Sequence, residues 1–221
     1  MKLAHSDIRE ILEIQEGEIY SVVVENPRFF YEIVKELKLQ IDGSDGRWVL
    51  SENEKPLMLK NRCELIFDYI DFKANKKTLI SKIVGNLAEI ALDNQHIDST
   101  TELLSQIERH IYCLAEQIDI DLFCDDFTIQ QIIKTTGISV ALEGENLVEI
   151  IYSYMRVVRE ILGDRLFVFI NLKTLVSEKD LVAFCETVRC HDYKIVFFDN
   201  KIYDLPIEEK HLIIDNDLCE I

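Results

Sequence analysis

The chain has 221 residues, of which 48% are apolar, and it carries a formal net charge of −17. This length supports one substantial core, with or without an appended subdomain, and the apolar content excludes an intrinsically disordered chain. The acidic balance excludes nonspecific attachment to nucleic acid or to anionic membranes through overall charge. Binding to DNA would therefore need a local basic surface, cations that offset the acids, or both.

The six cysteines are scattered along the chain without a C-x-x-C pair. The nearest approach to a zinc motif is the trio Cys185, Cys190 and His191. Zinc sites use clustered ligands at short spacing, whereas this trio is more typical of a helix and its end. The N-terminus does not resemble a signal peptide, and no apolar run reaches membrane-spanning length. These features predict a cytoplasmic protein with reduced thiols and without membrane contact.

The first part of the chain predicts short strands followed by a helix. Arg9–Gln15 alternates between polar and apolar residues, and Ile19–Val24 is a run rich in β-branched residues, both typical of strands. Asn26 and Pro27 begin the predicted helix, because Asn caps a helix and Pro suits its first turn. Another short strand is predicted at residues 47–50.

The middle of the chain is predominantly helical. A strand is predicted at Glu64–Ile70, followed by helices at residues 75–92 and 97–118 whose apolar residues recur at helical spacing. This helix pair predicts a protruding helical leg that covers residues 89–136.

The C-terminal part alternates helices with continuous apolar strands. Helices are predicted at residues 128–134, 145–162 and 177–188, and strands at residues 138–142, 166–170, 195–198 and 212–214. Continuous apolar strands are typical of a sheet that is buried on both faces. The alternation predicts an α/β head with a parallel or mixed sheet, formed by residues 1–88 and 137–221.

Residues 72–88 form a basic stretch without an acid, in which Lys73, Lys76, Lys77 and Lys82 are the bases. The stretch lies between a predicted strand and a predicted helix, where phosphate-binding loops occur. Lys76-Lys77-Thr78 resembles the end of a P-loop, but Asp71 and Lys76 stand where its glycines belong. Without glycine the backbone cannot wrap a triphosphate. A solvated basic turn and contact with an external phosphate both remain open.

Residues 116–137 are strongly acidic, with no Lys or Arg between Arg109 and Lys134. The acids are Glu116, Asp119, Asp121, Asp125 and Asp126. Such crowding is costly unless a cation neutralises it, and calcium accepts the irregular oxygen geometry of a helix-to-loop corner. The alternative is a solvated corner whose last acids precede a helix at Thr128, where anions suit the helix dipole. The spacing does not match an EF-hand.

Three segments carry a family resemblance. The C-terminal half contains R-L-F-V-F-I-N-L-K-T-L-V-S-E-K-D-L from Arg165 and K-I-V-F-F-D-N-K-I-Y-D-L-P from Lys194. The acids lead into D-D-F-T-I-Q-Q-I-I-K-T-T-G-I from Asp125, and L-I-F-D-Y-I-D-F-K-A-N-K-K-T-L-I-S-K-I-V-G-N-L begins at Leu65. In this order and at this length, the segments resemble the Csn-type accessory proteins of type II-A CRISPR loci, and together they cover most of the chain.

The resemblance implies an α/β head related to ATPase folds but without nucleotide motifs, an inserted helical leg, and a homotetrameric ring. It also implies calcium (Ca2+) bound by the acidic segment. Carried over by position, the candidate ligands are Glu116, Asp119, Asp121, Asp125 and Asp126. Phe123 and Cys124 interrupt this run of acids, which leaves the number of ions open.

The resemblance further implies sequence-independent binding of double-stranded DNA ends in the hole of the ring. The implied role of the protein is in spacer acquisition, beside the integrase complex and the RNA-guided nuclease. A ring would gather each subunit's bases around the duplex, where they would contact phosphates without reading bases. The candidate DNA-binding residues are Lys73, Lys76, Lys77, Arg156 and Arg159. A solvated helix surface is the alternative for these bases.

Two enzymatic functions are the alternatives to a DNA-binding protein. One is a nucleotide hydrolase with an eroded P-loop, against which the missing glycines weigh. The other is a metal-dependent nuclease that uses the acidic segment, although these acids lie beside the predicted leg. The five histidines are dispersed and do not suggest a Ser/His/Asp arrangement. The sequence therefore favours a protein that is not an enzyme.

Overall fold

The computed structural model spans residues 1–221 and describes all of them except 71, 73, 119–122 and 124. Contacts divide the chain into two compact units. Unit 1 holds Met1–Phe72 and Leu142–Ile221, and unit 2 holds Lys73–Ala141. The sequence places residues 73–88 and 137–141 in the head, whereas the contacts group these residues with the helices of unit 2.

Unit 1 is built on a five-stranded parallel sheet with the order β6-β7-β8-β3-β9. The strands are β3 (Ile19–Val24), β6 (Cys63–Ile66), β7 (Leu166–Ile170), β8 (Lys194–Asp199) and β9 (Lys210–Ile214). Every residue of β3, β6, β7 and β8 is buried, which agrees with their continuous apolar runs. The predicted α/β class with a parallel or mixed sheet is confirmed.

One face of this sheet forms the main core with α1 and a small antiparallel sheet. Helix α1 covers Pro27–Ile41, and the second sheet has the order β2-β1-β4-β5. Its strands are β1 (Lys2–His5), β2 (Leu12–Glu13), β4 (Trp48–Glu52) and β5 (Lys55–Leu57), with the short helix α2 (Leu59–Arg62) next in the chain. Trp48 joins these layers, because its indole nitrogen donates to the Ile33 carbonyl at 3.0 Å and its ring meets Phe198 edge-on.

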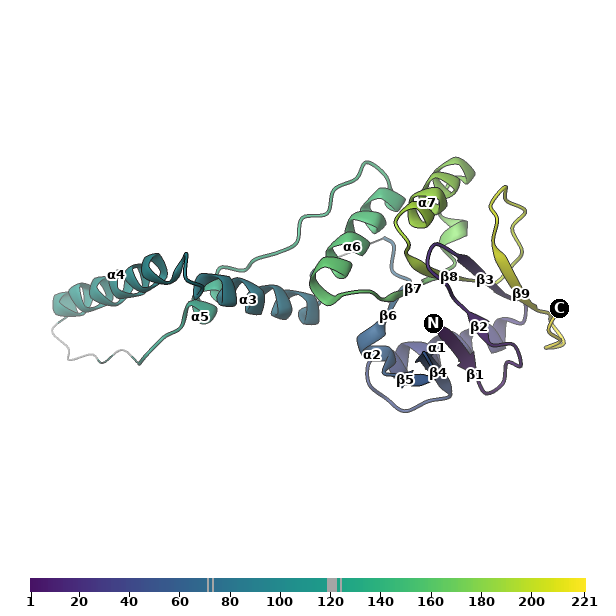
Figure 1. The fold of residues 1–221 in the computed structure, drawn as a ribbon, viewed down its shortest axis with the longest axis horizontal. Coiled ribbons are helices and arrows are strands. Elements are labelled where there is room, and N and C mark those ends of the chain that lie inside the picture. The colour runs from purple at the N-terminus through teal and green to yellow at the C-terminus, as the bar shows by residue number, and fades with distance from the viewer. Residues whose placement is uncertain (71, 73, 119–122, 124) are drawn as a thin grey trace. The chain divides into compact units, whose positions relative to one another are not determined.

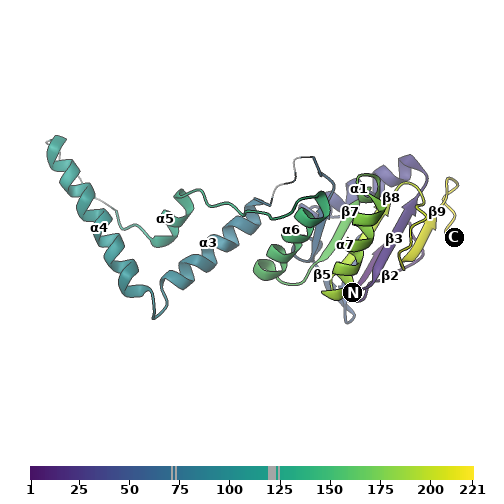
Figure 2. The ribbon, with the colours of Figure 1, turned by 90° about the horizontal axis from the view of Figure 1, so that it is seen from above.

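The opposite face of the parallel sheet is covered by α6 (Leu147–Leu162) and α7 (Glu178–Cys190) (Figure 1). Phe169 of β7 packs edge-on against Phe184 of α7, with ring centroids 5.7 Å apart. A short 3-10 turn, η2 (Leu172–Thr174), follows β7. Figure 2 shows the strands of this sheet beside α7. Layers on both faces explain why the strands are apolar throughout.

Unit 2 is entirely helical among the residues that the structure describes. It contains α3 (Lys77–Ala91), α4 (Ile97–Ala115), the 3-10 turn η1 (Glu116–Ile118) and α5 (Ile129–Thr135). Helices α3 and α5 pack together. The corner between α3 and α4 is closed by Thr100, whose hydroxyl donates to the Ala91 carbonyl at 2.8 Å. The two predicted long helices are confirmed.

Several helix ends form where capping residues predict them. The Asn26 side chain accepts hydrogen bonds from two amides of the first turn of α1, and Ser177 caps α7. Thr128 and Gln131 form a capping box at the start of α5. Gly163 ends α6 with a φ of 79°, a backbone conformation that favours glycine.

Three strand predictions need correction. Residues 138–142 form no strand, because the Val140 amide donates to the Asn75 side chain instead of to a neighbouring strand. The strand predicted at Arg9–Gln15 shrinks to β2, since Glu220 accepts hydrogen bonds from the Arg9 and Glu10 amides. The strand predicted at Glu64–Ile70 ends at Ile66, whose carbonyl accepts from the Tyr69 hydroxyl.

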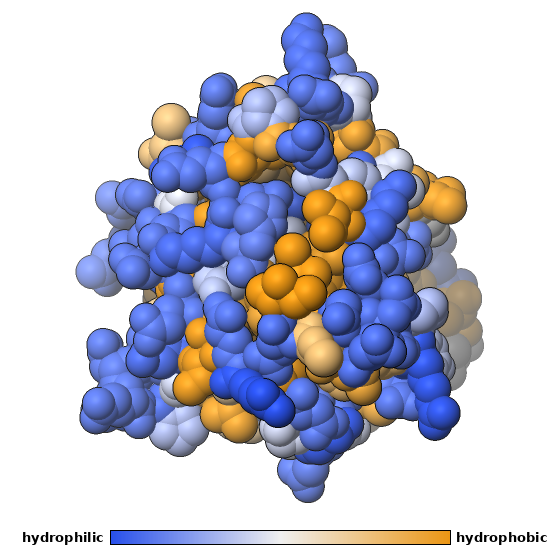
Figure 3. Space-filling view, turned by 90° about the vertical axis from the view of Figure 1, so that its right-hand side faces the viewer, coloured by the Kyte–Doolittle hydropathy of each residue, from blue (hydrophilic) through white to orange (hydrophobic). Residues whose placement is uncertain are grey.

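The surface seen in Figure 3 is mainly hydrophilic, with apolar side chains gathered in several patches between the polar ones. Such a mixture is normal for a folded protein surface. None of the helices in the described part of the chain has the length and apolar character needed to span a membrane.

Candidate nucleic-acid and metal-binding sites

The basic stretch lies at the start of α3, where Lys76 is the N-cap residue and Lys77 is the first helical residue. Both lysines are exposed, and the first turn contains no acid. The Lys76 side chain makes no capping hydrogen bond. The positive end of the helix dipole and two lysines therefore act in the same direction, which favours an anion such as phosphate at this end.

The segment before α3 is anchored within unit 2. Ala74 is buried, and the Asn75 side-chain oxygen accepts a hydrogen bond of 2.9 Å from the Val140 amide. This anchoring fixes the backbone immediately before Lys76 and Lys77 while their side chains remain exposed. Lys73, the third predicted DNA-binding lysine, lies outside the described residues.

The two predicted DNA-binding arginines lie on α6 in unit 1, where they have different surroundings. Arg159 donates to the His191 carbonyl at 2.7 Å and pairs with Asp164 at 3.2 Å. Its guanidinium also stacks 3.5 Å from the ring centroid of Tyr193. Arg156 instead lines a cleft between α6 and α7. Arg159 thus has a clear intramolecular role, and DNA contact by either arginine stays a prediction.

The acidic segment follows the C-terminal end of α4. Glu116 begins η1, and Asp125 and Asp126 precede the capping residue Thr128 of α5, all three exposed. Asp119 and Asp121 lie outside the described residues. Within the described ranges, His, Cys, Asp and Glu form no group of three that could hold a metal ion. Carboxylate oxygens nevertheless suit a hard cation, so the donor chemistry of the segment fits calcium.

The residues considered for zinc do not form a site. Cys185 is buried in α7, where burial raises the pKa of its thiol to about 12. Cys190 is the last residue of α7, and His191 is its C-cap, with Nδ1 of the ring 2.9 Å from the Thr187 carbonyl. This arrangement agrees with the predicted helix and its end.

Strand β3 of unit 1, which lies between β8 and β9 in the sheet, leads directly into α1 without a phosphate-binding loop. Only Glu25 and Asn26 separate the strand from Pro27, the first helical residue. Asn26 accepts hydrogen bonds from the Arg28 and Phe29 amides, and Pro27 has no amide hydrogen. The amides that a P-loop would present to phosphate are therefore already bonded here. The other P-loop-like sequence, Lys76-Lys77-Thr78, begins a helix of unit 2.

A buried charge cluster lies beneath α7. The ammonium of Lys173 donates to both carboxylate oxygens of Glu209 at 2.8 Å and to the Ser21 hydroxyl at 3.0 Å. Asp199 lies 3.6 Å from the same ammonium, and its carboxylate makes no hydrogen bond within the described part of the chain. Burial raises the pKa of Asp199 to about 7, against the opposing effect of Lys173.

No sequence motif predicts this cluster or the stacking of Arg159 on Tyr193. In both cases the partners lie far apart in the chain, so no local motif reveals them. The one available signal is Lys173 itself, a charged residue three positions after the last residue of the buried apolar strand β7.

Comparison with solved structures identifies the fold. The chain resembles the structure described as "Crystal structure of Stu0660 of Streptococcus thermophilus", with a TM-score of 0.63 and 14% sequence identity. The match covers all of this chain and 76% of that one. At this identity the likeness supports a shared fold.

Sequence comparisons define the class of protein. A family model described as "CRISPR-associated protein (Cas_Csn2)" matches residues 40–218. The CRISPR-associated protein Csn2 of Streptococcus agalactiae is 22% identical over 211 residues, covering 94% of this chain and 87% of the relative. The Csn2 protein of Enterococcus faecalis is 22% identical over 204 residues, covering 91% of each chain. The chain is thus a CRISPR-associated protein. It belongs to the Csn2 family, as the resemblance of its segments predicts.

Proposed function

We propose that this protein binds the ends of double-stranded DNA without sequence preference, as a calcium-dependent homotetrameric ring that serves CRISPR spacer acquisition. In this role it acts without catalysis and beside the integrase complex and the RNA-guided nuclease. The observation that carries the proposal is membership of the Csn2 family over most of the chain. The chemistry of two exposed segments in unit 2 supports it.

The start of α3 suits contact with DNA phosphates. In a chain with a net charge of −17, Lys76 and Lys77 lie exposed at the positive end of a helix dipole. Contacts of this kind bind the DNA backbone and carry no sequence information. Several subunits around one duplex would multiply these contacts, so a ring compensates for the small number of bases in each chain.

Calcium would offset the charge of the acidic segment. The candidate ligands are Glu116, Asp119, Asp121, Asp125 and Asp126. Bound calcium would lower the repulsion among these carboxylates and between them and DNA. The charge of the chain thus supports a calcium dependence of DNA binding.

Helix α4 offers a surface for assembly. Its aliphatic residues Ile97, Leu103, Ile111 and Leu114 are exposed. An apolar stripe of this kind on a helix is normally covered by another element. Association with other subunits would cover it, which agrees with a homotetramer.

The test measures affinity for one duplex sequence in linear and covalently closed circular form, with calcium and with excess chelator. We expect binding to the linear form in calcium and a loss of affinity with chelator. The double variant Lys76→Ala/Lys77→Ala should bind linear DNA roughly tenfold more weakly and show a smaller salt dependence. The control Lys55→Ala/Lys179→Ala removes two exposed lysines of unit 1 and should bind like the unaltered chain.

Equal affinity for linear and circular DNA in calcium and in chelator would contradict the proposal. Cleavage of the DNA in magnesium or manganese would instead identify a nuclease.

A further inference from the structure

A cleft on unit 1 lies between α6 and α7 and has a volume of about 780 Å³. Helix α6 lines it with Glu149, Tyr152 and Arg156, and α7 lines it with Asp180, Ala183 and Thr187. These residues recur three or four apart, so each helix presents one face to the cleft. The volume falls within the range of sites that hold a ligand or a peptide side chain.

The segment that precedes α6 forms one wall of the cleft, and Gly144 allows its close approach. A Cβ atom at Gly144 would lie 2.6 Å from the Ile150 amide nitrogen and 2.7 Å from Cβ of Glu149. The backbone of Gly144 also has a φ of 153°. The Glu143 amide then donates to the Ser153 hydroxyl at 3.1 Å, which ties the segment to α6.

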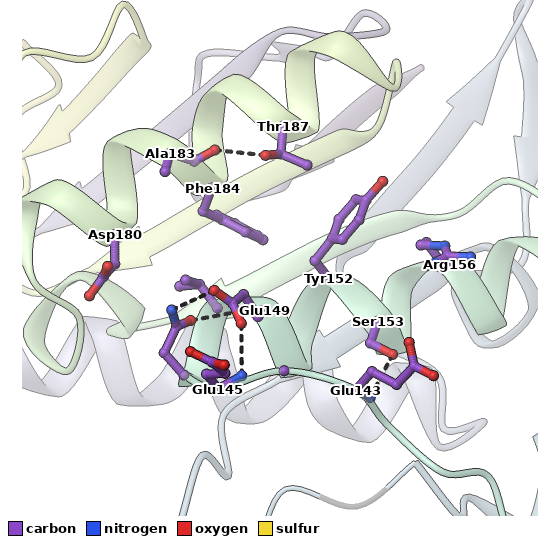
Figure 4. A pocket seen from close by; sticks show the side chains of 13 residues that line it. Glu143, Glu145, Glu149, Tyr152, Ser153, Arg156, Asp180, Ala183, Phe184 and Thr187 are labelled. Carbon is purple, nitrogen blue, oxygen red and sulfur yellow. Dashed lines mark hydrogen bonds between the residues drawn. The ribbon is translucent and has the colours of Figure 1, made fainter.

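Two aromatic rings supply a firm apolar surface inside the cleft. Phe184 packs edge-on against Phe169 of the sheet. Tyr152 is held between His191 and Tyr193, with ring centroids 5.6 and 5.9 Å away. Figure 4 shows the rings of Tyr152 and Phe184 directed into the space between the helices. These ring contacts hold both aromatic side chains in place before a ligand arrives.

Carboxylates gather at one end of the cleft. Figure 4 shows Glu145 and Glu149 there on the side of α6, with Asp180 across from them on α7. Glu149 is held in place, because it accepts from the Glu145 amide at 2.7 Å and from the Asn146 side chain at 2.9 Å. Asp180 accepts from the Ser177 hydroxyl at 2.6 Å. These carboxylates keep oxygen lone pairs for a cation that enters between them.

We propose that this cleft binds a basic segment of a partner protein through one arginine or lysine side chain. The stem of that side chain lies on Tyr152 and Phe184, and its cationic group meets Glu145 and Asp180. Aromatic faces and carboxylates both attract cations. The same carboxylates repel DNA phosphates, and a second copy of a chain with a net charge of −17 is a poor electrostatic match.

The proposal does not involve Lys76 or Lys77 and is tested with short peptides. The probes are Ac-Gly-Leu-Arg-Gly-NH2 and its neutral counterpart Ac-Gly-Leu-Gln-Gly-NH2, titrated into the isotope-labelled full chain and followed through backbone amide signals. We expect the arginine peptide to cause saturable shifts at Tyr152, Ser153, Ala183 and Phe184. The glutamine peptide should cause at most small, non-saturating shifts.

A pair of double variants separates the cleft from general acidity. Glu145→Gln/Asp180→Asn should weaken binding of the arginine peptide roughly fivefold or more. Glu160→Gln/Glu186→Gln removes the same charge from exposed positions of α6 and α7 outside the cleft, and should leave the affinity within about twofold. Thermal unfolding of each variant checks that the fold is retained.

Three results would overturn the proposal. The first is equal shifts with both peptides, and the second is equal weakening by both double variants. The third is the same shifts on raising the protein concentration without peptide, which would assign the cleft to a second copy of this chain.

Discussion

Two acids, Asp199 and Glu209, lie beside the single ammonium of Lys173 beneath α7. All three side chains are buried, so water does not screen the excess negative charge. Glu209 makes the two short hydrogen bonds to Lys173 and is its ion-pair partner. Asp199 stands slightly farther away without a hydrogen bond in the described part of the chain. The arrangement favours a neutral, protonated Asp199, which agrees with its raised pKa.

This protonation makes the stability of unit 1 depend on pH. The pKa of Asp199 is about 7 in the folded chain, against about 3.9 for an unfolded aspartate. Between these values folding binds a proton, so the free energy of unfolding falls as pH rises towards 7 and stays low above it. The variant Asp199→Asn keeps the shape and removes this dependence. Its stability advantage over the unaltered chain should grow by about 2 kcal/mol between pH 5 and pH 7.5.

Urea unfolding of both proteins at several pH values measures this difference. An advantage that does not change with pH would mean that Asp199 is ionised throughout the range.

Replacing Lys173 by methionine should lower the free energy of unfolding, whereas Asp199→Asn should raise it. Lys173→Met leaves Glu209 buried without a cation, and loss of one partner of a buried ion pair costs about 3–5 kcal/mol. The free energy of unfolding at pH 7.5 checks this expectation. Lys179→Met, at an exposed position of α7, is the control and should change stability by less than about 0.5 kcal/mol. Equal stability of Lys173→Met and the unaltered chain would show that the cluster is not a stabilising ion pair.

At the residue scale, the sequence predicts what depends on near neighbours. Asn26 caps α1 as expected, because a cap needs only amides two or three residues away. The partners of Lys173 come from three separate parts of the chain. Two partners of Arg159, His191 and Tyr193, lie more than 30 residues further along the chain. No local rule finds contacts that depend on the complete fold.

At the scale of elements, the Asn26 cap carries a separate prediction. Asn26→Ala removes the acceptor for the Arg28 and Phe29 amides and should lower the free energy of unfolding by about 1 kcal/mol. Asn26→Asp keeps an acceptor and should lose less than the alanine variant. Urea unfolding measures the free energy of unfolding of both variants. An equal decrease in the two variants would show that the cap contributes little to stability.

Helix α4 carries the prediction for assembly. Leu103→Glu/Ile111→Glu places charges on its exposed apolar stripe and should shift the proposed calcium-bound tetramer to smaller species. Ser105→Glu/Gln106→Glu adds the same charge on the polar face of α4 and should leave the proposed tetramer intact. Sedimentation velocity in calcium compares both variants with the unaltered chain at the same concentration. A tetramer that tolerates charges on the stripe would place the subunit contacts elsewhere.

The sequence predicts strongly patterned elements well and weakly patterned ones poorly. The apolar runs of β3, β7 and β8 and the long helices of unit 2 form as expected. Residues 138–142 show strand-like alternation, yet the Val140 amide donates to the Asn75 side chain, and alternation alone does not supply a strand partner. The lack of a pairing partner also explains why only part of Arg9–Gln15 becomes a strand.

At the scale of the whole molecule, α/β class and family follow from the order of the segments. The sequence does not predict the strand order, the second antiparallel sheet or the cleft between α6 and α7. These features depend on which strands pair and which helix faces pack together. Of the candidate DNA-binding lysines, Lys76 and Lys77 are exposed in unit 2, and Lys73 lies outside the described residues. Of the candidate calcium ligands, Asp119 and Asp121 lie outside the described residues.

The central claim is that calcium bound by the acidic segment controls assembly of a DNA-binding ring. Light scattering of the purified protein, first with calcium and then with excess chelator, tests this claim most directly. We expect a tetramer in calcium that dissociates or loosens when the ion is removed. A monomer of unchanged mass under both conditions would contradict the account and leave the acidic segment as a solvated corner of unit 2.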